Sequence, residues 1–408
     1  MQDAVRLTNR LGIRYIWIDA LCIIQGDADD WEKESLCMGD VYENSHFTIA
    51  ASGATSSDQG LYAVRDPLRL FPCKLGIPRQ GALYAKAVSE SQLDQEPLYG
   101  RDWVLQERLF SRRTLNFGSL FVWECKTKTL DEFDPVDTIG LLNAELSVKK
   151  TFDNLHPTAN ENPEFIDSWN RKVVEPYTNA RLTYQSDRLV AISGVIQRIE
   201  RDTGWTNICG LWKPWLLEEL LWGSGYFRIS KARISKAIPR MRISAAPTWS
   251  WASVNTPVWR FNSYHSNNHY IIEEVPQCLD SGTGALTLRG HLFSIRRDEW
   301  DEWFERGKIV NFGEVSSPVN LFPDLDSLDD FENCSHWLLP ICWTSPLPES
   351  RVREYAQVLN GIILVQSPRD ATKFERIGYW GLETNDDNLA TDIQTALSIS
   401  TLVNISII

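Results

Sequence analysis

Apolar and polar positions follow their most regular pattern at the start of the chain, where they predict a helix and then a strand. Ala4, Leu7 and Leu11 recur at helical spacing and predict a short helix over Asp3–Leu11. Tyr15–Ile24 is an almost unbroken apolar run without alternation, which is typical of a strand covered on both faces. We therefore expect this run to lie inside a sheet.

The next segment predicts a second helix and a second strand. Asp29 and Glu32 have the spacing of a capping box for a helix over Trp31–Asn44, and Phe47–Ala51 has the composition of a strand. At about 100° per residue, one stripe of this helix gathers aromatic, apolar and acidic side chains. Its members are Trp31, Glu34, Met38, Val41 and Tyr42.

A third helix and a hairpin complete the predicted core. Asp102–Ser111 reads as a helix, and Arg113–Phe117 and Leu120–Cys125 flank Gly118-Ser119 as a β-hairpin does. The alternation of helices and strands predicts an α/β fold with a parallel sheet and flanking helices.

The pattern changes twice along the rest of the chain. Helical spacing dominates from Ile166 to Trp222, and short alternating runs such as Leu286–Gly290 and Gly361–Val365 indicate strands further on. We expect three parts: an α/β core over residues 1–125, a mostly helical region over 126–255 and a β-rich region over 256–408.

Composition narrows the class of protein. The 408 residues are 43% hydrophobic and 23% charged, as in a soluble globular protein, and the net charge of −13 argues against nucleic acid as a partner. The eight scattered cysteines read as reduced, buried thiols, and 17 tryptophans read mainly as core. Without a membrane span or signal peptide, we expect a cytoplasmic protein.

The sequence offers no convincing metal site or phosphate loop. His265 and His269 are four residues apart, but they lie in a predicted polar loop of Asn and Ser rather than on a helix. A glycine-rich loop of the G-x-x-x-x-G-K-[ST] type is absent. We expect no bound metal and no cofactor.

Two carboxylates lie in apolar stretches, where burying an ionised carboxylate costs free energy. Asp19 lies inside the apolar run, and Glu34 lies near the middle of the helical stripe. An ionised carboxylate facing a core needs a partner or a solvated cleft. Either a pocket opens there, or arginines hold both acids for structural reasons; the candidate arginines are Arg101, Arg108, Arg112 and Arg113.

The third helix raises a similar choice. Gln106 and Glu107 lie on the same side as Trp103 and Phe110, so they could reach a ligand in the same cleft. The alternative is that both are hydrogen-bonded braces between the helix and the hairpin, because buried polar groups usually satisfy one another.

Two blocks of residues together resemble the fungal heterokaryon-incompatibility (HET) domain. The first is YIWIDALCIIQ at Tyr15–Gln25, followed by DWEKE at Asp30–Glu34, Met38, Val41-Tyr42 and TIAASG at Thr48–Gly53. The second is RDWVLQERL at Arg101–Leu109 with FVWEC at Phe121–Cys125. Further landmarks extend the resemblance to about Val254. The family's usual first strand, of the form Y-x-aLSY-x-WG, does not precede the first helix here, so the sheet is expected to be incomplete.

The resemblance implies a chemistry. HET cores are similar to TIR domains, whose enzymatic members cleave NAD with a glutamate near a strand end. The resemblance to the HET family therefore implies that Glu34 and Asp19 are catalytic acids, and that NAD is a possible substrate rather than a cofactor. The substrate-binding residues that it implies in the same cleft are Trp17, Trp31, Arg101, Trp103, Gln106 and Glu107.

The resemblance also implies a function, an effector of fungal non-self recognition that promotes programmed cell death, through NAD cleavage as a TIR-like NADase. Two alternatives stay open: a non-enzymatic scaffold that signals by homotypic association of the core, and a repurposed enzyme acting on a small molecule in a Trp-lined cavity. The expected partners are an unknown protein trigger and further copies of the chain, in a homo-oligomer through the α/β core.

Overall fold

The chain folds into two compact units, each of which is described by itself. The computed structural model describes residues 1–63, 71, 73–76, 83–85, 93, 96–132, 149, 163–180, 187–224, 246–260, 266–273, 277–278, 284–295, 308–312, 314–323, 335–346 and 357–408. Unit 1 comprises Met1–His156, Ala180–Thr183 and Val190–Asp202, and unit 2 comprises Pro157–Asn179, Tyr184–Leu189 and Thr203–Ile408.

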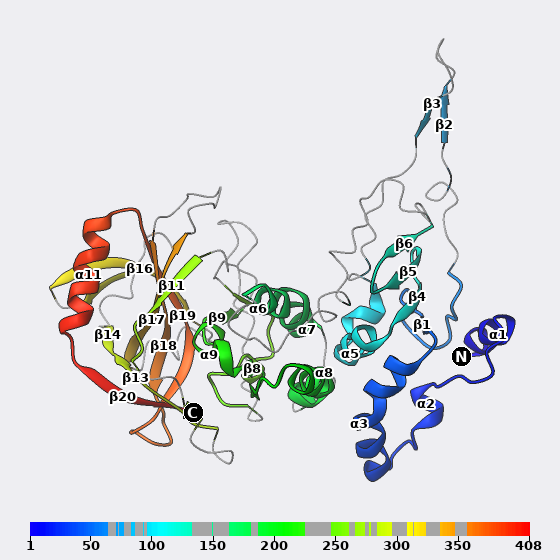
Figure 1. The fold of residues 1–408 in the computed structure, drawn as a ribbon, viewed down its shortest axis with the longest axis horizontal. Coiled ribbons are helices and arrows are strands. Elements are labelled where there is room, and N and C mark those ends of the chain that lie inside the picture. The colour runs from blue at the N-terminus through cyan, green and yellow to red at the C-terminus, as the bar shows by residue number, and fades with distance from the viewer. Residues whose placement is uncertain are drawn as a thin grey trace. The chain divides into compact units, whose positions relative to one another are not determined.

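Unit 1 is a mixed sheet with helices (Figure 1). Its sheet has the order β1-β4-β5-β6, in which β1 pairs parallel with β4 and the other pairs are antiparallel. The strands are β1 (Thr48–Ala50), β4 (Arg113–Phe117), β5 (Phe121–Cys125) and β6 (Thr129–Asp131). The helices and the separate hairpin are α1 (Gln2–Arg10), α2 (Asp19–Cys22), α3 (Ala28–Asn44), η2 (Pro97–Gly100), α5 (Asp102–Phe110), β2 (Cys73–Gly76) and β3 (Leu83–Ala85).

Most predicted elements of this unit are confirmed, with one change of cap. The first helix, the strand near Thr48, the third helix and the hairpin form where the pattern places them. The second helix starts earlier than predicted, because Asp27 rather than Asp29 is its cap and accepts hydrogen bonds from the N–H groups of Asp29 and Asp30.

The predicted strand over Tyr15–Ile24 is wrong. Residues 13–18 belong to no helix or strand, and Asp19–Cys22 forms the short helix α2. Tyr15 is 79% exposed and Leu21 is 66% exposed, so the run is not covered on two faces. A fully apolar strand needs a neighbour on each side, and in the described sheet the parallel partner of β1 is β4. The sheet is therefore mixed rather than wholly parallel.

The N-terminal part of unit 2 is helical and rich in tryptophan. Its helices include α6 (Pro163–Trp169), the π-helix η6 (Asn170–Val174), α7 (Glu175–Asn179) and α9 (Leu216–Glu219). The long helix α8 (Arg188–Thr203) begins in this unit and runs mainly in unit 1. Short pieces β7 (Asn207–Ile208), β8 (Leu211–Trp212), η8 (Lys213–Trp215), β9 (Trp222–Ser224), η9 (Trp251–Ser253) and β10 (Val258–Arg260) follow. The prediction that tryptophans serve the core is confirmed at Trp169, Trp212, Trp222, Trp249, Trp251 and Trp380.

A large sheet forms the β-rich end of the chain, as predicted. Its order is β11-β17-β18-β19-β20-β13-β12, with β14 added on β17 and the β15–β16 hairpin on β19. The strands are β11 (Ser266–Tyr270), β12 (Gln277–Cys278), β13 (Leu286–His291), β14 (Phe293–Ile295), β15 (Lys308–Phe312), β16 (Val315–Pro323), β17 (His336–Pro346), β18 (Gln357–Gln366), β19 (Phe374–Thr384) and β20 (Leu402–Ile407). Helix α11 (Asp387–Ile399) lies on this sheet (Figure 1) and contributes Ile393 to its core.

Two smaller expectations change. His269 lies in β11, not in a loop, while His265 lies outside the described residues. The six cysteines whose side chains are described are free, but Cys22, Cys37 and Cys73 are exposed rather than buried. In the part of the chain that the structure describes, no helix has the length and apolarity to cross a membrane.

Candidate functional site

Four polar side chains of unit 1 converge where α2, α3 and α5 meet. Asp19 starts α2, Tyr42 lies near the end of α3, Arg101 directly precedes α5, and Glu107 lies within α5. Each of the other three acts electrostatically on the Glu107 carboxyl. We call Asp19, Tyr42, Arg101 and Glu107 the acid–tyrosine cluster.

Close packing of two helices makes this convergence possible. Gly39 of α3 faces Phe110 of α5, and a Cβ at Gly39 would lie 3.1 Å from Phe110 Cε2. A larger residue there would push the helices apart. Met38, one position away, is buried on the same helix, which fixes the rotation of α3.

Burial and a hydrogen bond from Tyr42 shift the pKa of Glu107 in opposite directions. The Tyr42 hydroxyl donates a hydrogen bond to the Glu107 carboxylate. Burial of the carboxyl raises the pKa of Glu107; the nearby Asp19 carboxylate adds to this, while the Tyr42 hydrogen bond and Arg101 oppose it. Burial and the Glu107 carboxylate likewise raise the pKa of Tyr42 far above its usual range. The cluster thus holds a desolvated carboxyl with a raised pKa, that of Glu107, beside the more exposed carboxyl of Asp19.

Aromatic rings flank the cluster on α3, on α5 and on the stretch that precedes α2. Trp17 meets Tyr42 edge to face, with ring centroids 5.8 Å apart, and Trp31 meets Trp103 at 6.0 Å. Trp31 remains 42% exposed. Five of the residues predicted to bind substrate lie in the α3–α5 region, namely Trp17, Trp31, Arg101, Trp103 and Glu107.

Asp19 and Glu34 occupy different surroundings. Asp19 is exposed, and its Oδ1 accepts a hydrogen bond of 2.7 Å from the Ala20 N–H. Glu34 lies half-buried on α3, and among the described residues its side chain forms no hydrogen bond or ion pair. Of the two acids that the sequence singles out, Asp19 is the one beside Glu107.

Two of the four arginines named as alternative partners, Arg108 and Arg113, have other partners. Arg108 makes a two-pronged ion pair with Glu124, with Nε 3.0 Å from Oε2 and Nη2 3.0 Å from Oε1. Arg113 donates to the His46 carbonyl over 3.1 Å. Arg112 is exposed. Arg108 therefore pairs with Glu124 rather than with Asp19 or Glu34, whereas Arg101 lies in the acid–tyrosine cluster together with Asp19.

The Arg108–Glu124 pair extends into a buried network. Lys149 Nζ lies 4.0 Å from Glu124 Oε2 and donates to the Ser111 carbonyl and to Thr114 Oγ1 over 2.8 and 2.6 Å. Burial lowers the pKa of Lys149 to about 8, against the opposing effect of Glu124. This network ties α5 to the β4–β5 hairpin and is structural in character.

Gln106 points away from the acid–tyrosine cluster. Its side chain is 3% exposed and packs on Gly194 of α8, where an added Cβ would lie 2.9 Å from Gln106 Nε2. Neighbouring positions on a helix face different directions, which is why Gln106 and Glu107 separate. Gln106 thus packs on α8 rather than on the hairpin, and among the described residues its buried Oε1 has no hydrogen-bond partner, so it does not form the hydrogen-bonded brace to the hairpin that was the predicted alternative.

Tyr42 is the residue of this cluster that the sequence does not single out as a candidate. It belongs to the predicted inner stripe of α3 and so reads as core. One feature of the sequence could have identified it: the hydroxyl of Tyr42 lies on the same helical stripe as Glu34, and a buried tyrosine hydroxyl usually has a hydrogen-bond partner.

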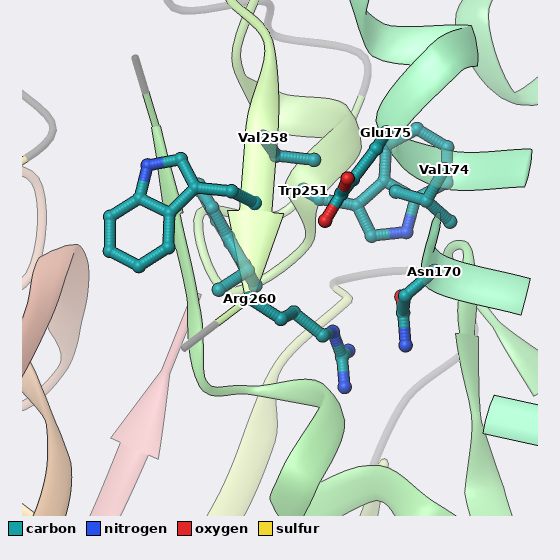
Figure 2. A pocket seen from close by; sticks show the side chains of 8 residues that line it. Asn170, Val174, Glu175, Trp251, Val258 and Arg260 are labelled. Atoms are coloured by element: carbon teal, nitrogen blue, oxygen red, sulfur yellow. The ribbon is translucent and has the colours of Figure 1, made fainter. Parts of the chain in front are cut away.

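A second feature is a small pocket in unit 2 (Figure 2). Trp222, Trp251 and Trp259 line it together with Asn170, Val174, Glu175, Val258 and Arg260, and the π-helix supplies two of these residues. Its open space is about that of one water molecule, well below the several hundred Å³ of usual ligand pockets. Arg260 beside it is held by a buried ion pair with Glu219. As it stands, the pocket is a packing feature.

No group of three or more His, Cys, Asp or Glu side chains among the described residues could hold a metal ion. The acid–tyrosine cluster offers two carboxyl groups in different surroundings, one desolvated and one exposed, with the cationic side chain of Arg101 beside them.

The segment that contains this cluster matches a known protein family. The family model described as Heterokaryon incompatibility protein (HET) matches residues 1–107, so the chain carries a HET domain over that segment. A HET domain implies a role in heterokaryon incompatibility and the cell death that accompanies it. Neither the curated proteins nor the solved structures contain a match to this chain.

Proposed function

We propose that this protein is an effector of fungal heterokaryon incompatibility that promotes cell death by cleaving the nicotinamide–ribose bond of NAD. One observation carries the enzymatic part of the proposal. Asp19, Tyr42, Arg101 and Glu107 converge within the HET domain, and the carboxyl of Glu107 is desolvated there. Perturbed carboxyls beside a second charge are more frequent at active sites than elsewhere.

The groups suit this reaction. Breaking the glycosidic bond leaves a ribosyl cation of oxocarbenium character, and nicotinamide departs with the bonding electron pair. The Asp19 carboxylate stabilises the cation, and water then adds to it to give ADP-ribose and a proton. Glu107, whose pKa is raised by burial, hydrogen-bonds to a ribose hydroxyl or to the departing ring. The Arg101 guanidinium binds a phosphate oxygen.

The flanking rings bind the two flat parts of such a substrate. Trp17 beside Tyr42 offers an aromatic edge at the cluster, and the half-exposed Trp31 with Trp103 offers a second one on the same helices. Glu34 is one to two helical turns from Trp31 and Tyr42 along α3, so it remains in the proposal as a residue that orients the ribose. Gln106 acts as a positioning residue through α8.

Regulated expression in a fungal host tests the proposal. We expect the wild-type chain to lower cellular NAD before viability falls, and Asp19→Asn and Glu107→Gln to prevent both effects at equal protein levels. Asp58→Asn, at an exposed acid in the same unit, is the matched control and should behave as wild type. Death without any loss of NAD would contradict the enzymatic proposal.

Cell death without loss of NAD would favour the second candidate function, a non-enzymatic scaffold. A separate observation supports this alternative. Tyr15, Ile16, Leu21 and Ile24 are exposed apolar side chains within ten residues of one another. An apolar surface of this kind is typical of an interaction site. A scaffold would kill when it assembles, and Glu107→Gln would leave its activity intact.

A further inference from the structure

The sheet of unit 1 has an edge at which two parallel strands end together. β1 and β4 are neighbours, with Ala50 opposite Asn116, so their carboxyl ends lie side by side (Figure 1). The stretches that follow the two strands stay paired, because the Gly53 N–H donates a hydrogen bond to the Phe117 carbonyl over 3.0 Å. We call this end of β1 and β4 the carboxyl edge.

The segment that leads into α5 is held on the carboxyl edge by the carboxylate of Glu96. Glu96 Oε1 accepts hydrogen bonds from the Ser119 N–H over 2.8 Å and from Ser119 Oγ over 2.5 Å. Two glycines make room for this carboxylate: a Cβ at Gly118 would lie 2.7 Å from Glu96 Oε1, and a Cβ at Gly53 would lie 3.3 Å from Glu96 Oε2. Hydrogen bonds to an ionised acceptor are stronger than neutral ones, so we expect this contact to hold the segment most firmly.

Two further contacts hold the same segment. The Leu98 N–H donates to the Ser52 carbonyl over 3.1 Å, and the Tyr99 hydroxyl donates to Asn116 Oδ1. Arg101 follows directly, and its own N–H donates to the Leu98 carbonyl over 3.2 Å. The backbone of Arg101 is therefore fixed by contacts that the residues just before it make with the carboxyl edge.

Arg101 is the cation of the acid–tyrosine cluster, so its position affects Glu107. Its positive charge opposes the rise in the pKa of Glu107 that burial causes. Among the described residues, no hydrogen bond or ion pair holds the guanidinium of Arg101, so its position depends on where the backbone begins. Because the attraction between two charges weakens as they separate, a shift of this backbone would weaken the effect on Glu107.

We propose that Glu96 is a positioning residue of the candidate site: by holding the turn η2 on the carboxyl edge, it places the Arg101 guanidinium beside Glu107 and toward the phosphate groups of the substrate. The part of this proposal that concerns the substrate rests on the proposed cleavage of NAD, whereas the placement beside Glu107 does not. When the Glu96 carboxylate is removed, the segment loses its charge-assisted contact, and Arg101 withdraws from Glu107.

The direction in which the pKa of Glu107 changes gives the test. Removing the negative charge of Glu96 lowers the pKa of Glu107 if charge alone acts, whereas withdrawal of Arg101 raises it. Glu96→Leu should therefore raise the pKa of Glu107, as measured by NMR titration of its carboxyl carbon in the labelled full chain. Glu96→Gln retains an oxygen that accepts from Ser119, so it should leave this pKa unchanged or lower it.

Further variants show whether Arg101 is the link. Arg101→Leu should also raise the pKa of Glu107, and Glu96→Leu should add nothing in that background. Ser119→Ala removes one of the two donors at an exposed position and leaves the charge of Glu96 in place, so it should raise this pKa even if Glu96→Leu does not fold. Asp58→Leu, at an exposed acid of the same unit, is the control and should behave as wild type.

The activity gives a separate readout. If the chain cleaves NAD, Glu96→Leu should raise KM about tenfold, the effect of losing one hydrogen bond to a charged group, whereas Glu96→Gln should not. A wild-type chain that cleaves no NAD would contradict the proposed function, and the titration would still decide the placement of Arg101.

Two results would overturn the positioning role. The first is a folded Glu96→Leu or Ser119→Ala variant in which the pKa of Glu107 does not rise. The second is a rise in Glu96→Leu that is equally large when Arg101 has been replaced by leucine, since the effect would then not pass through Arg101.

Discussion

The hydroxyl of Tyr42, on α3, is hydrogen-bonded to the carboxylate of Glu107, on α5, inside the segment that matches the HET family. This contact joins two blocks of sequence that are more than sixty residues apart. It places a tyrosine and a desolvated acid beside Asp19 and Arg101, and the predictions below follow from it and from the buried network next to it.

The stability of unit 1 should depend on the ionisation of Glu107. Because burial raises its pKa above the ordinary value of 4.5, the folded state binds this proton more tightly than the unfolded state. Its contribution is therefore greatest at low pH and is lost as pH rises from about 4.5 through the raised pKa. Glu107→Gln should remove this dependence, as measured by thermal unfolding across pH. Glu34→Gln should leave it in place.

Removing the hydroxyl of Tyr42 should destabilise the α3–α5 contact. Tyr42→Phe takes away a hydrogen bond to a carboxylate, which costs about 1.5–3 kcal/mol. It should also raise the pKa of Glu107 further, since that bond lowers it. Faster hydrogen exchange in α3 and α5 would show the effect locally. Tyr15→Phe, at an exposed tyrosine, serves as the control, and equal exchange in both variants would contradict the contact.

Replacing one partner of the Arg108–Glu124 ion pair should lower the free energy of unfolding more than replacing both partners. Glu124 is 1% exposed, so Arg108→Ala leaves a buried carboxylate whose remaining cationic neighbour among the described residues is Lys149, at an expected cost of about 3–5 kcal/mol. The double variant Arg108→Met with Glu124→Leu should lose less than either partner alone. Denaturant unfolding measures both. Arg112→Ala, at an exposed arginine, should change stability by no more than about 0.5 kcal/mol.

Lys149 should give unit 1 a rise in stability in alkaline solution. Its pKa is lowered to about 8 from an ordinary 10.5, so between these pH values the unfolded state binds more protons than the folded one. Stability therefore increases as pH rises from about 8 to about 10.5. Subtracting the unfolding curve of Lys149→Met from that of the wild type should reveal this increase, whereas Lys128→Met, at an exposed lysine, should show no difference.

The sequence predicts the local elements of unit 1 well and its sheet less well. Helical spacing and the capping acids locate α1, α3 and α5, because these signals act within a few residues. The run from Tyr15 to Ile24 carries an equally strong signal for a strand, yet no neighbour pairs with it in the described sheet. Pairing depends on residues far away in the chain, and composition does not report it.

The same limit applies to the candidate site. Asp19, Arg101 and Glu107 stand out from the sequence because charged groups interrupt apolar patterns, and the structure brings them together. It could not be foreseen that Gln106 faces α8 while Glu107 faces Tyr42. That choice depends on how α5 is rotated against its neighbours, which packing at Gly39 and Gly194 decides.

The most direct test of the central claim is the release of nicotinamide from NAD by the purified chain, measured beside Asp19→Asn, Glu107→Gln and the control Asp58→Asn. We predict release by the wild type and by Asp58→Asn, and its loss in the two variants of the acid–tyrosine cluster while they remain folded. Release that persists unchanged in Glu107→Gln and Asp19→Asn, or no release from folded wild-type protein, would contradict the account.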